Sequence, residues 1–228
     1  EAAMYKLTAR SDGTPQVAWR TPYDRGKSHK PGQLSQGSGT TPTLLDNGVL
    51  AITDNAEPRM NVLFLERSTG REICREPVFE KGASATENSL VSLGDAVLVE
   101  NNHGYTSLVR TMLGFATEPG IARVDLRGGE CSTAWTSDVV APTSVPKASW
   151  ANGLAYVYSK RPTWTGVSAW YVTAIDVATG RARWSVRTGT GTLLNNHYAA
   201  ITLGPDGSLW IATLAGLVRV RDRGHGED

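Results

Sequence analysis

Four short stretches of the chain share one order: a strand-like segment, a turn that ends in glycine, and a second strand-like segment that ends in tryptophan or cysteine. The turn glycines are Gly13, Gly70, Gly129 and Gly180, which are separated by 57, 59 and 51 residues. A period of this size is typical of repeat architectures, in which each repeat is one supersecondary unit that stacks on its neighbours. The chain is therefore expected to fold into several similar units rather than around one irregular core.

A second recurring element lies between these turns and consists of alternating strands joined by tight hairpins. Its turns contain Asn47-Gly48, Gly94-Asp95, Asn152-Gly153 and Asp206-Gly207. Asn-Gly and Asp-Gly supply the positive φ angles that a two-residue hairpin demands. No stretch of about a dozen residues keeps a helical period with caps. Each repeat is therefore predicted to contain four strands and no helix.

The repeat predicts an all-β fold, a β-propeller of four-stranded antiparallel blades, with four to five blades in this chain. A single domain is expected over 1–228, with a half-blade at 4–22, blades near 40–80, 84–138 and 143–188, and a partial blade at 197–222. Pairing the last strands with the first would close a ring and remove exposed strand edges. The alternative fold, an irregular β-sandwich, has to treat the equal spacing as chance.

The segment Ala174–Trp184 reads Ala-x-Asp-x-x-Thr-Gly-x-x-x-Trp and resembles the repeat of quinoprotein-like β-propellers, the pyrroloquinoline-quinone type. In that repeat the tryptophan docks between blades, and the Thr-Gly pair makes the turn on which it packs. Trp19 and Trp135 lie two residues further from their glycines than Trp184 does, and Cys74 replaces the tryptophan altogether. The resemblance covers the whole chain as an indication of fold.

Propellers with this repeat are mostly extracytoplasmic, so the resemblance implies an extracytoplasmic or secreted location. They usually have more blades than four or five, which implies that the remainder of a larger propeller, from a further segment or a partner chain, completes this one. The superfamily includes redox enzymes and also non-catalytic outer-membrane assembly lipoproteins. Bound pyrroloquinoline quinone is not expected here, because the chain is short for those dehydrogenases and lacks their adjacent-cysteine pair.

Charge and hydropathy argue against two kinds of partner. Lys and Arg number 23 against 22 Asp and Glu, and they form no basic stripe, so nucleic acid is not expected as a partner. The longest apolar runs, such as 96–99, are strand-sized. A membrane helix needs roughly 20 apolar residues, so no membrane span is expected.

The two cysteines, Cys74 and Cys131, are too few for a disulfide framework and lack the close spacing of a zinc knuckle. Both follow a glycine and a glutamate, which suggests similar outer-strand positions in neighbouring blades. Two alternatives stay open: a disulfide between them, or two buried thiols that act as small hydrophobes. The pair of buried thiols is the expectation.

Polar residues follow the second strand of each repeat and precede its innermost strand. In a propeller the inner strands line the axial channel, and the loops at one mouth carry most binding groups. The side-chain oxygens of these polar residues are hard donors of the kind that coordinate Ca²⁺, which is the candidate metal. The structural alternative is that Asn and Asp cap turns. The ligand-binding residues predicted on this rim are Asp54, Asn55, Asn88, Asn101, Asn102, Tyr105, Lys160, Asn195, Asn196 and Tyr198.

Two histidines, His103 and His197, each follow an Asn-Asn pair at the predicted rim. A neutral imidazole beside a carboxylate acts as a general base at physiological pH. The predicted catalytic residues are therefore these two histidines, with Glu87 or Glu100 as the orienting partner. The structural alternative is that each histidine satisfies a backbone group of its own loop.

Two classes of function stay open. The first is a small-molecule or metal site on the rim of a hydrolase or lyase, where Lys160 and Tyr105 would hold an anionic or hydroxylated ligand. This rim looks similar to the axial site of calcium-dependent lactonases, although none of their motifs matches residue by residue. The second is a non-catalytic scaffold that binds a protein or a polymer, and fold does not decide between the two. The polar segment 24–41 is either a lid over the rim or an inter-blade connection, and the connection is expected.

Overall fold

The computed structural model describes residues 2–222. Apart from loops and turns, the regular secondary structure of these residues is almost entirely β-strand. The strands form five separate antiparallel sheets, in which strands that follow one another in the chain pair side by side. Helical structure within these residues is limited to two 3-10 turns, η1 (Arg110–Met112) and η2 (Thr192–Leu194). The described part contains no helix that is long and apolar enough to cross a membrane.

Three of the sheets have four strands each. The first contains β3 (Thr43–Leu44), β4 (Val49–Thr53), β5 (Asn61–Glu66) and β6 (Glu72–Pro77). The second contains β7 (Val91–Ser92), β8 (Ala96–Glu100), β9 (Ile121–Arg127) and β10 (Glu130–Ser137). The third contains β11 (Lys147–Ser149), β12 (Leu154–Pro162), β13 (Ser168–Asp176) and β14 (Ala182–Thr190).

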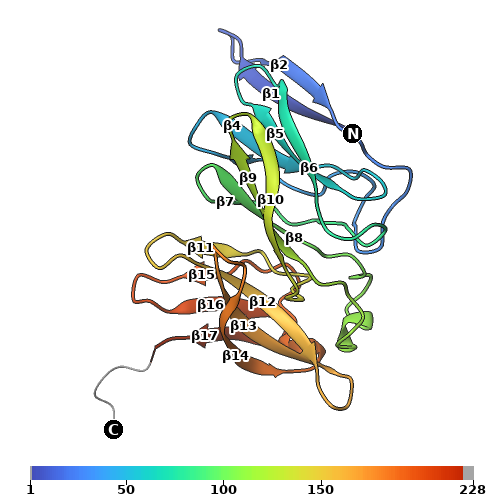
Figure 1. Ribbon diagram of the computed structural model, residues 1–228, viewed down its shortest axis with the longest axis vertical. Coiled ribbons are helices and arrows are strands. Elements are labelled where there is room, and N and C mark those ends of the chain that lie inside the picture. The colour runs from blue at the N-terminus through green and yellow to red at the C-terminus, as the bar shows by residue number, and fades with distance from the viewer. Residues whose placement is uncertain (1, 223–228) are drawn as a thin grey trace.

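Two smaller sheets contain the first and the last strands. The first is the hairpin of β1 (Ala3–Ala9) and β2 (Pro15–Pro22). The last contains β15 (Thr202–Leu203), β16 (Leu209–Thr213) and β17 (Gly216–Val220). The sheets stack side by side as the blades of a propeller do (Figure 1). The predicted all-β fold of four-stranded antiparallel blades is confirmed.

The core lies between neighbouring sheets. Every residue of β4 and of β8 is buried, because adjacent blades cover both faces of these strands. Such strands carry continuous apolar runs instead of alternating patterns. In the largest cluster, Val62 and Phe64 of β5 pack with Val97 of β8 and Val124 of β9. Burial of these side chains therefore holds one blade against the next.

Tryptophans on outer strands dock on the turn glycines of the next blade. Trp19 donates its indole N–H to a turn carbonyl 3.3 Å away, and its ring lies where a Cβ at Gly70 would come within 2.6 Å. Trp135 lies on Gly180 in the same way, with an indole hydrogen bond of 3.0 Å. Both glycines have positive φ angles, 76° and 72°. They are required by the turn and by the close approach of the indole.

The equivalent junction between β6 and β10 is covalent. Cys74 and Cys131 form a disulfide with a Cα–Cα distance of 5.9 Å. The expectation of two buried thiols is therefore wrong. The physical reason is that the two outer strands run side by side: Glu76 accepts hydrogen bonds from the backbone N–H and the hydroxyl of Thr133, at 3.0 and 2.8 Å. Stacking of the blades thus brings the two sulfurs together.

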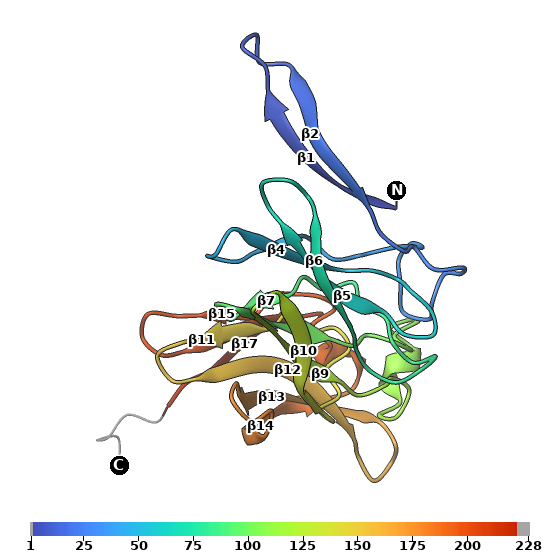
Figure 2. The same cartoon turned by 45° about the horizontal axis from the view of Figure 1, so that its top comes forward.

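The first and last strands do not pair, so the predicted ring closure is wrong for the described residues. The β1–β2 hairpin and the β15–β17 sheet are separate sheets and lie apart from each other (Figures 1 and 2). The hairpin contains the Gly13 turn that is equivalent to the Gly70 turn between β5 and β6, so it corresponds to the two outer strands of a blade. The last sheet corresponds to three inner strands. Together they would give five strands, one more than a blade holds.

Candidate functional site

A depression of about 430 Å³ opens where three loops meet, and we call it the rim depression. Residues 29 and 31–34 come from the segment before β3, residues 105–108 follow β8, and residues 197 and 198 lie between η2 and β15. Three of the residues predicted at the rim, Tyr105, His197 and Tyr198, form one wall of it. Loops from separate blades thus build one site.

Tyr105, His197 and Tyr198 contact one another. The hydroxyl of Tyr105 lies 2.8 Å from Nδ1 of His197, within hydrogen-bond distance. The two tyrosine rings meet edge to face with centroids 5.4 Å apart, and the imidazole centroid lies 6.1 Å from the Tyr105 centroid and 5.6 Å from that of Tyr198. Edge-to-face contact at this distance is a favourable aromatic geometry. The three rings therefore form an ordered aromatic wall.

The backbone at His197 and Tyr198 is left-handed, with φ angles of 42° and 67°. Two consecutive non-glycine residues in this region are unusual and strained. The conformation is held by the side chain of Asn195, whose Oδ1 accepts the His197 N–H at 2.8 Å, and by the Asn196 carbonyl, which accepts the Ala199 N–H at 2.8 Å. Strain of this kind clusters at binding sites, where it positions side chains.

Asn102 lies buried behind the aromatic wall. Its Nδ2 donates to the Tyr198 hydroxyl and to the Gly32 carbonyl, both at 3.0 Å, so it ties the second and third loops to the first. Burial raises the pKa of Tyr198, and the carboxyl of Glu100 adds to the rise. The Tyr198 hydroxyl is therefore neutral at neutral pH. The Oδ1 atom of Asn102 is buried without a hydrogen-bond partner in the described structure.

The two predicted acidic partners lie near this wall. Leu34 donates its N–H to Glu87 Oε1 at 2.9 Å, and Asn88 donates its Nδ2 to Glu100 Oε2 at 2.5 Å. Burial raises the pKa of Glu87, and it raises that of the fully buried Glu100 well above its ordinary value. Within residues 2–222 no hydrogen bond or salt bridge joins either carboxyl to His103 or His197. The general-base pairing stays a prediction.

His103 lies outside the lining of the rim depression and is half buried. Its backbone N–H donates to Asn101 Oδ1 at 3.1 Å, and burial lowers its pKa while Glu118 opposes the change. Its Nδ1 has no hydrogen-bond partner in the part of the chain that the structure describes. Of the two predicted histidines, His197 therefore lines the rim depression and His103 does not.

Several predicted rim residues stabilise turns. Asp54 accepts the N–H of Ala56 at 3.1 Å, a local contact of the same kind as those made by Asn101 and Asn195. Asn55 holds the 24–41 segment through the Arg25 carbonyl at 2.8 Å, and Thr143 donates its hydroxyl to Asn196 at 2.6 Å. The contacts of Asp54, Asn101 and Asn195 match the turn-capping alternative, whereas those of Asn55 and Asn196 join segments that lie far apart in the chain.

Lys160 contacts the loop between β8 and β9 instead of the rim depression. It is 1 % exposed, and its Nζ donates to the Leu113 carbonyl at 2.9 Å. Burial lowers its pKa to about 8. Lys160 is not part of the rim depression, so it does not provide the positive charge that an anionic ligand there would need. No group of three or more His, Cys, Asp or Glu side chains within 2–222 is placed to hold a metal ion.

The expectation of a plain inter-blade connection for the 24–41 segment left out its contribution to the depression. Pro31, Gln33 and Leu34 line the depression, and Asn55 accepts a hydrogen bond from Gln33 Nε2 at 2.8 Å. The signal was the length and polarity of this segment, which a short inter-blade connection does not need. The sequence offered no period from which its path could be placed.

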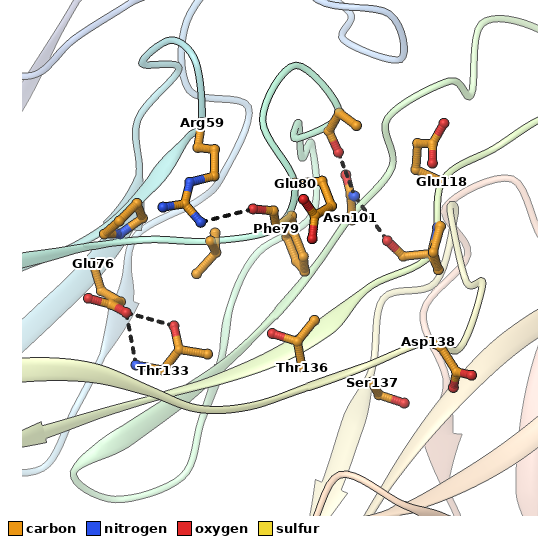
Figure 3. Close-up of a pocket in the computed structure, with 14 residues that line it drawn as sticks. Arg59, Glu76, Phe79, Glu80, Asn101, Glu118, Thr133, Thr136, Ser137 and Asp138 are labelled. Carbon is orange, nitrogen blue, oxygen red and sulfur yellow. Dashed lines mark hydrogen bonds between the residues drawn. The ribbon is translucent and has the colours of Figure 1, made fainter.

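A second depression, of about 470 Å³, lies between the outer strands β6 and β10 (Figure 3). Arg59 donates to the Phe79 carbonyl at 3.3 Å on its lining, and the hydrogen-bonded pair of Glu76 and Thr133 lines one end of it. The carboxylates of Glu80, Glu118 and Asp138 stand around the same space. Of the predicted site residues, Asn101 is the one that lines it.

Several known proteins of low sequence identity have a fold similar to that of this chain. BamB from Moraxella catarrhalis superposes with a TM-score of 0.59 at 15% identity, covering 96% of this chain and 62% of BamB. A europium-containing methanol dehydrogenase gives 0.58 at 12% identity, covering 95% and 48%. The quinohemoprotein alcohol dehydrogenase of Comamonas testosteroni gives 0.53 at 12% identity, covering 94% and 40%. The predicted resemblance to quinoprotein-like β-propellers is confirmed at the level of the fold.

Sequence comparison adds one relative. A protein of Archaeoglobus fulgidus described as "Uncharacterized protein" is 27% identical over 253 aligned residues, which cover 96% of this chain and 48% of that protein. No protein-family model matches the chain. The chain spans about half the length of this relative and less than two thirds of the solved propellers.

Proposed function

We propose that the rim depression binds a small, neutral, hydroxylated ligand outside the cytoplasm. The observation that carries the proposal is the aromatic wall of Tyr105, His197 and Tyr198, which a strained backbone and the buried Asn102 hold in one geometry. Ring faces bind the apolar face of a cyclic ligand, and the hydroxyl and imidazole groups pair with its polar edge. A monosaccharide or a cyclic polyol has this chemistry.

The charge of the site favours a neutral ligand. None of the residues that line the depression is Asp, Glu, Lys or Arg. An anion would therefore lack a cationic partner, since Lys160 donates to Leu113 elsewhere. A cation would lack a carboxylate on the lining itself, and burial raises the pKa of both Glu87 and Glu100 beside it. Hydroxyl groups need neither charge.

Hydrolase or lyase activity is an extension of this proposal. His197 would act as the base on the bound ligand, and the Tyr105 hydroxyl would orient its imidazole through Nδ1. This pairing takes the place of the carboxylate partner that the sequence predicts.

The location outside the cytoplasm is supported by the Cys74–Cys131 disulfide. Disulfides form and persist in oxidising compartments and are rare in the reducing cytosol. Propellers with the repeat that this chain resembles are mostly extracytoplasmic, which supports the same location.

The alternative function, a scaffold that binds another protein, is favoured by the unpaired ends of the stack. The outer edge of β17 and the inner edge of β1 have no neighbouring strand among the described residues. Free edges accept a further strand from another polypeptide. The remainder of a larger propeller is the partner that would fit both edges.

Thermal shift and calorimetry with a panel of monosaccharides and cyclic polyols test the proposal. Wild type should bind at least one of them, and Tyr105→Phe and Tyr198→Leu should weaken that binding by about tenfold or more, since each removes a polar contact or a ring face. Tyr171→Phe is the matched control. Tyr171 is on β13, its ring contacts the Arg161 guanidinium, and it lies outside the depression. Equal binding by all variants would place the ligand elsewhere.

A further inference from the structure

Within the loop between β8 and β9, residues 109–117 turn apolar side chains outward and threonine hydroxyl groups inward. Val109 and Phe115 are 73% and 71% exposed, whereas Thr111 and Thr117 are buried. Thr111 donates its hydroxyl to the Leu108 carbonyl at 2.7 Å. A loop that faces water places these groups the other way round. The reversed polarity points to an apolar surrounding on the outer side of the loop.

The tip of the β12–β13 hairpin extends this apolar surface. Trp164 at the tip is 98% exposed. The two loops are joined, because Gly114 donates its N–H to the Gly166 carbonyl at 2.9 Å and Leu113 forms a bridge with Val167. In both views the green coil of η1 and the β12–β13 loop lie on the same side of the molecule (Figures 1 and 2).

We call the exposed apolar side chains of these two loops the loop patch, made up of Val109, Met112, Leu113, Phe115 and Trp164. Its base is rigid, because buried groups hold the backbone beneath it. The Lys160 ammonium donates to the Leu113 carbonyl at 2.9 Å, and the Ser168 hydroxyl donates to the Thr111 carbonyl at 2.7 Å. The backbone that carries the patch is therefore anchored to the blade at Thr111 and Leu113.

The charged side chains within the two segments that carry the loop patch are both arginines, and the exposed Glu118 follows the first segment. The segments 106–117 and 161–167 contain Arg110 and Arg161 and no Asp or Glu. Both arginines are exposed. Exposed Trp, Phe and Leu beside arginines match the two layers of a bilayer interface, where apolar groups enter the acyl boundary and cations meet anionic headgroups.

We propose that the loop patch docks this protein on an anionic lipid surface. Trp164 and Phe115 enter the interfacial layer, while Arg110 and Arg161 contact the headgroups. Leu108, which directly precedes Val109 in the same loop, lines the rim depression. Docking would therefore place the mouth of the rim depression beside the lipid surface.

Flotation with vesicles tests this surface on the whole chain. The probes are vesicles of phosphatidylcholine alone and of phosphatidylcholine mixed with phosphatidylglycerol. Wild type should float with the anionic vesicles, and its bound fraction should fall as salt is added, because salt screens the arginines. Trp164→Ser with Phe115→Ser should lower the partition coefficient by about tenfold or more, since two buried apolar side chains are lost from the lipid.

Matched variants on the far side of the blades separate docking from general stickiness. Trp150→Ser removes a tryptophan that is 69% exposed next to the β11–β12 turn, at the opposite end of β12 from Trp164, and should leave flotation unchanged. Arg110→Gln should weaken binding to anionic vesicles, and Lys147→Gln on β11 should not. All of these residues are exposed, so melting temperatures should stay equal to that of wild type.

Three outcomes would overturn the proposal. One is wild type that stays in solution with both kinds of vesicle. Another is flotation that the double variant does not reduce. The third is a wild-type dimer that the double variant converts to a monomer without any change in flotation, which would assign the loop patch to a second copy of the chain.

Discussion

The hydroxyl of Tyr105 lies 2.8 Å from Nδ1 of His197, although 92 residues separate them in the chain. The same hydroxyl receives a hydrogen bond of 3.3 Å from Asn195 Nδ2. We expect Tyr105→Phe to lower the free energy of unfolding by about 1 kcal/mol, the usual loss when one buried hydrogen bond is removed. Urea denaturation measures this. Tyr171→Phe, at an inter-strand position outside the site, should change the free energy of unfolding less.

Substitution of the turn glycines separates the energetic cost of a left-handed backbone from that of steric contact with a docked tryptophan. Gly13 and Gly180 both have positive φ angles, 85° and 72°, but an added Cβ meets nothing within 4 Å at Gly13 and lies 2.6 Å from the Trp135 ring at Gly180. Gly13→Ala should cost about 1 kcal/mol for the backbone conformation alone. Gly180→Ala should cost that amount and about 1 to 3 kcal/mol more, because the indole must move.

Calorimetric melting of the two glycine variants measures the difference. Gly180→Ala should also increase the exposure of a tryptophan, which a shift of the fluorescence emission reports. Equal melting temperatures would show that the docking of Trp135 does not depend on the bare turn.

Reduction of the disulfide should destabilise the stack at one junction. Cys74 and Cys131 lie 57 residues apart, and their bond restricts the unfolded chain. Loss of such a bond removes about 2 to 4 kcal/mol from the free energy of unfolding. We expect a lower melting temperature in a reducing buffer than in an oxidising one.

The double variant Cys74→Ala with Cys131→Ala is the control for reduction. Its melting temperature should match that of the reduced wild type and should not respond to the reductant. A wild type that melts at the same temperature in both buffers would contradict the prediction.

Glu100 should make the protein less stable as the pH rises. Burial raises its pKa well above the ordinary value of 4.5, against the opposing effect of the Asn88 hydrogen bond. Because the folded state binds this proton more tightly than the unfolded state, the contribution to stability is complete below pH 4.5 and is lost as the pH rises through the folded pKa. Glu100→Gln cannot lose a proton, so it should become more stable than wild type as the pH increases.

Urea denaturation over a pH series tests the Glu100 prediction through the difference between variant and wild type, in which the effects of Asp54 and Glu87, whose pKa values burial also raises, cancel. Glu130→Gln, an exposed position at the start of β10, is the matched control and should follow the wild-type curve. Parallel curves for Glu100→Gln and wild type would show that Glu100 does not bind its proton more tightly when folded.

The rim could be predicted in part from the sequence. Because equivalent loops of stacked repeats lie at the same mouth, the repeat was enough to direct attention to Tyr105, His197 and Tyr198. It did not separate ligand-facing groups from turn caps, since Asp54 and Asn101 have the same residue types and the same position after a strand. Which of them faces open space depends on loop paths that follow no period.

The sequence by itself determined the four-stranded sheets and the glycine turns between their outer strands, because these depend on local alternation, turn chemistry and a regular spacing. Only the tertiary structure decided that Cys74 reaches Cys131, that Tyr105 reaches His197 and that the ends of the stack stay unpaired. The physical reason is that contacts between distant residues are set by how whole sheets stack and by the paths of aperiodic loops. Neither leaves a pattern that a single sequence displays.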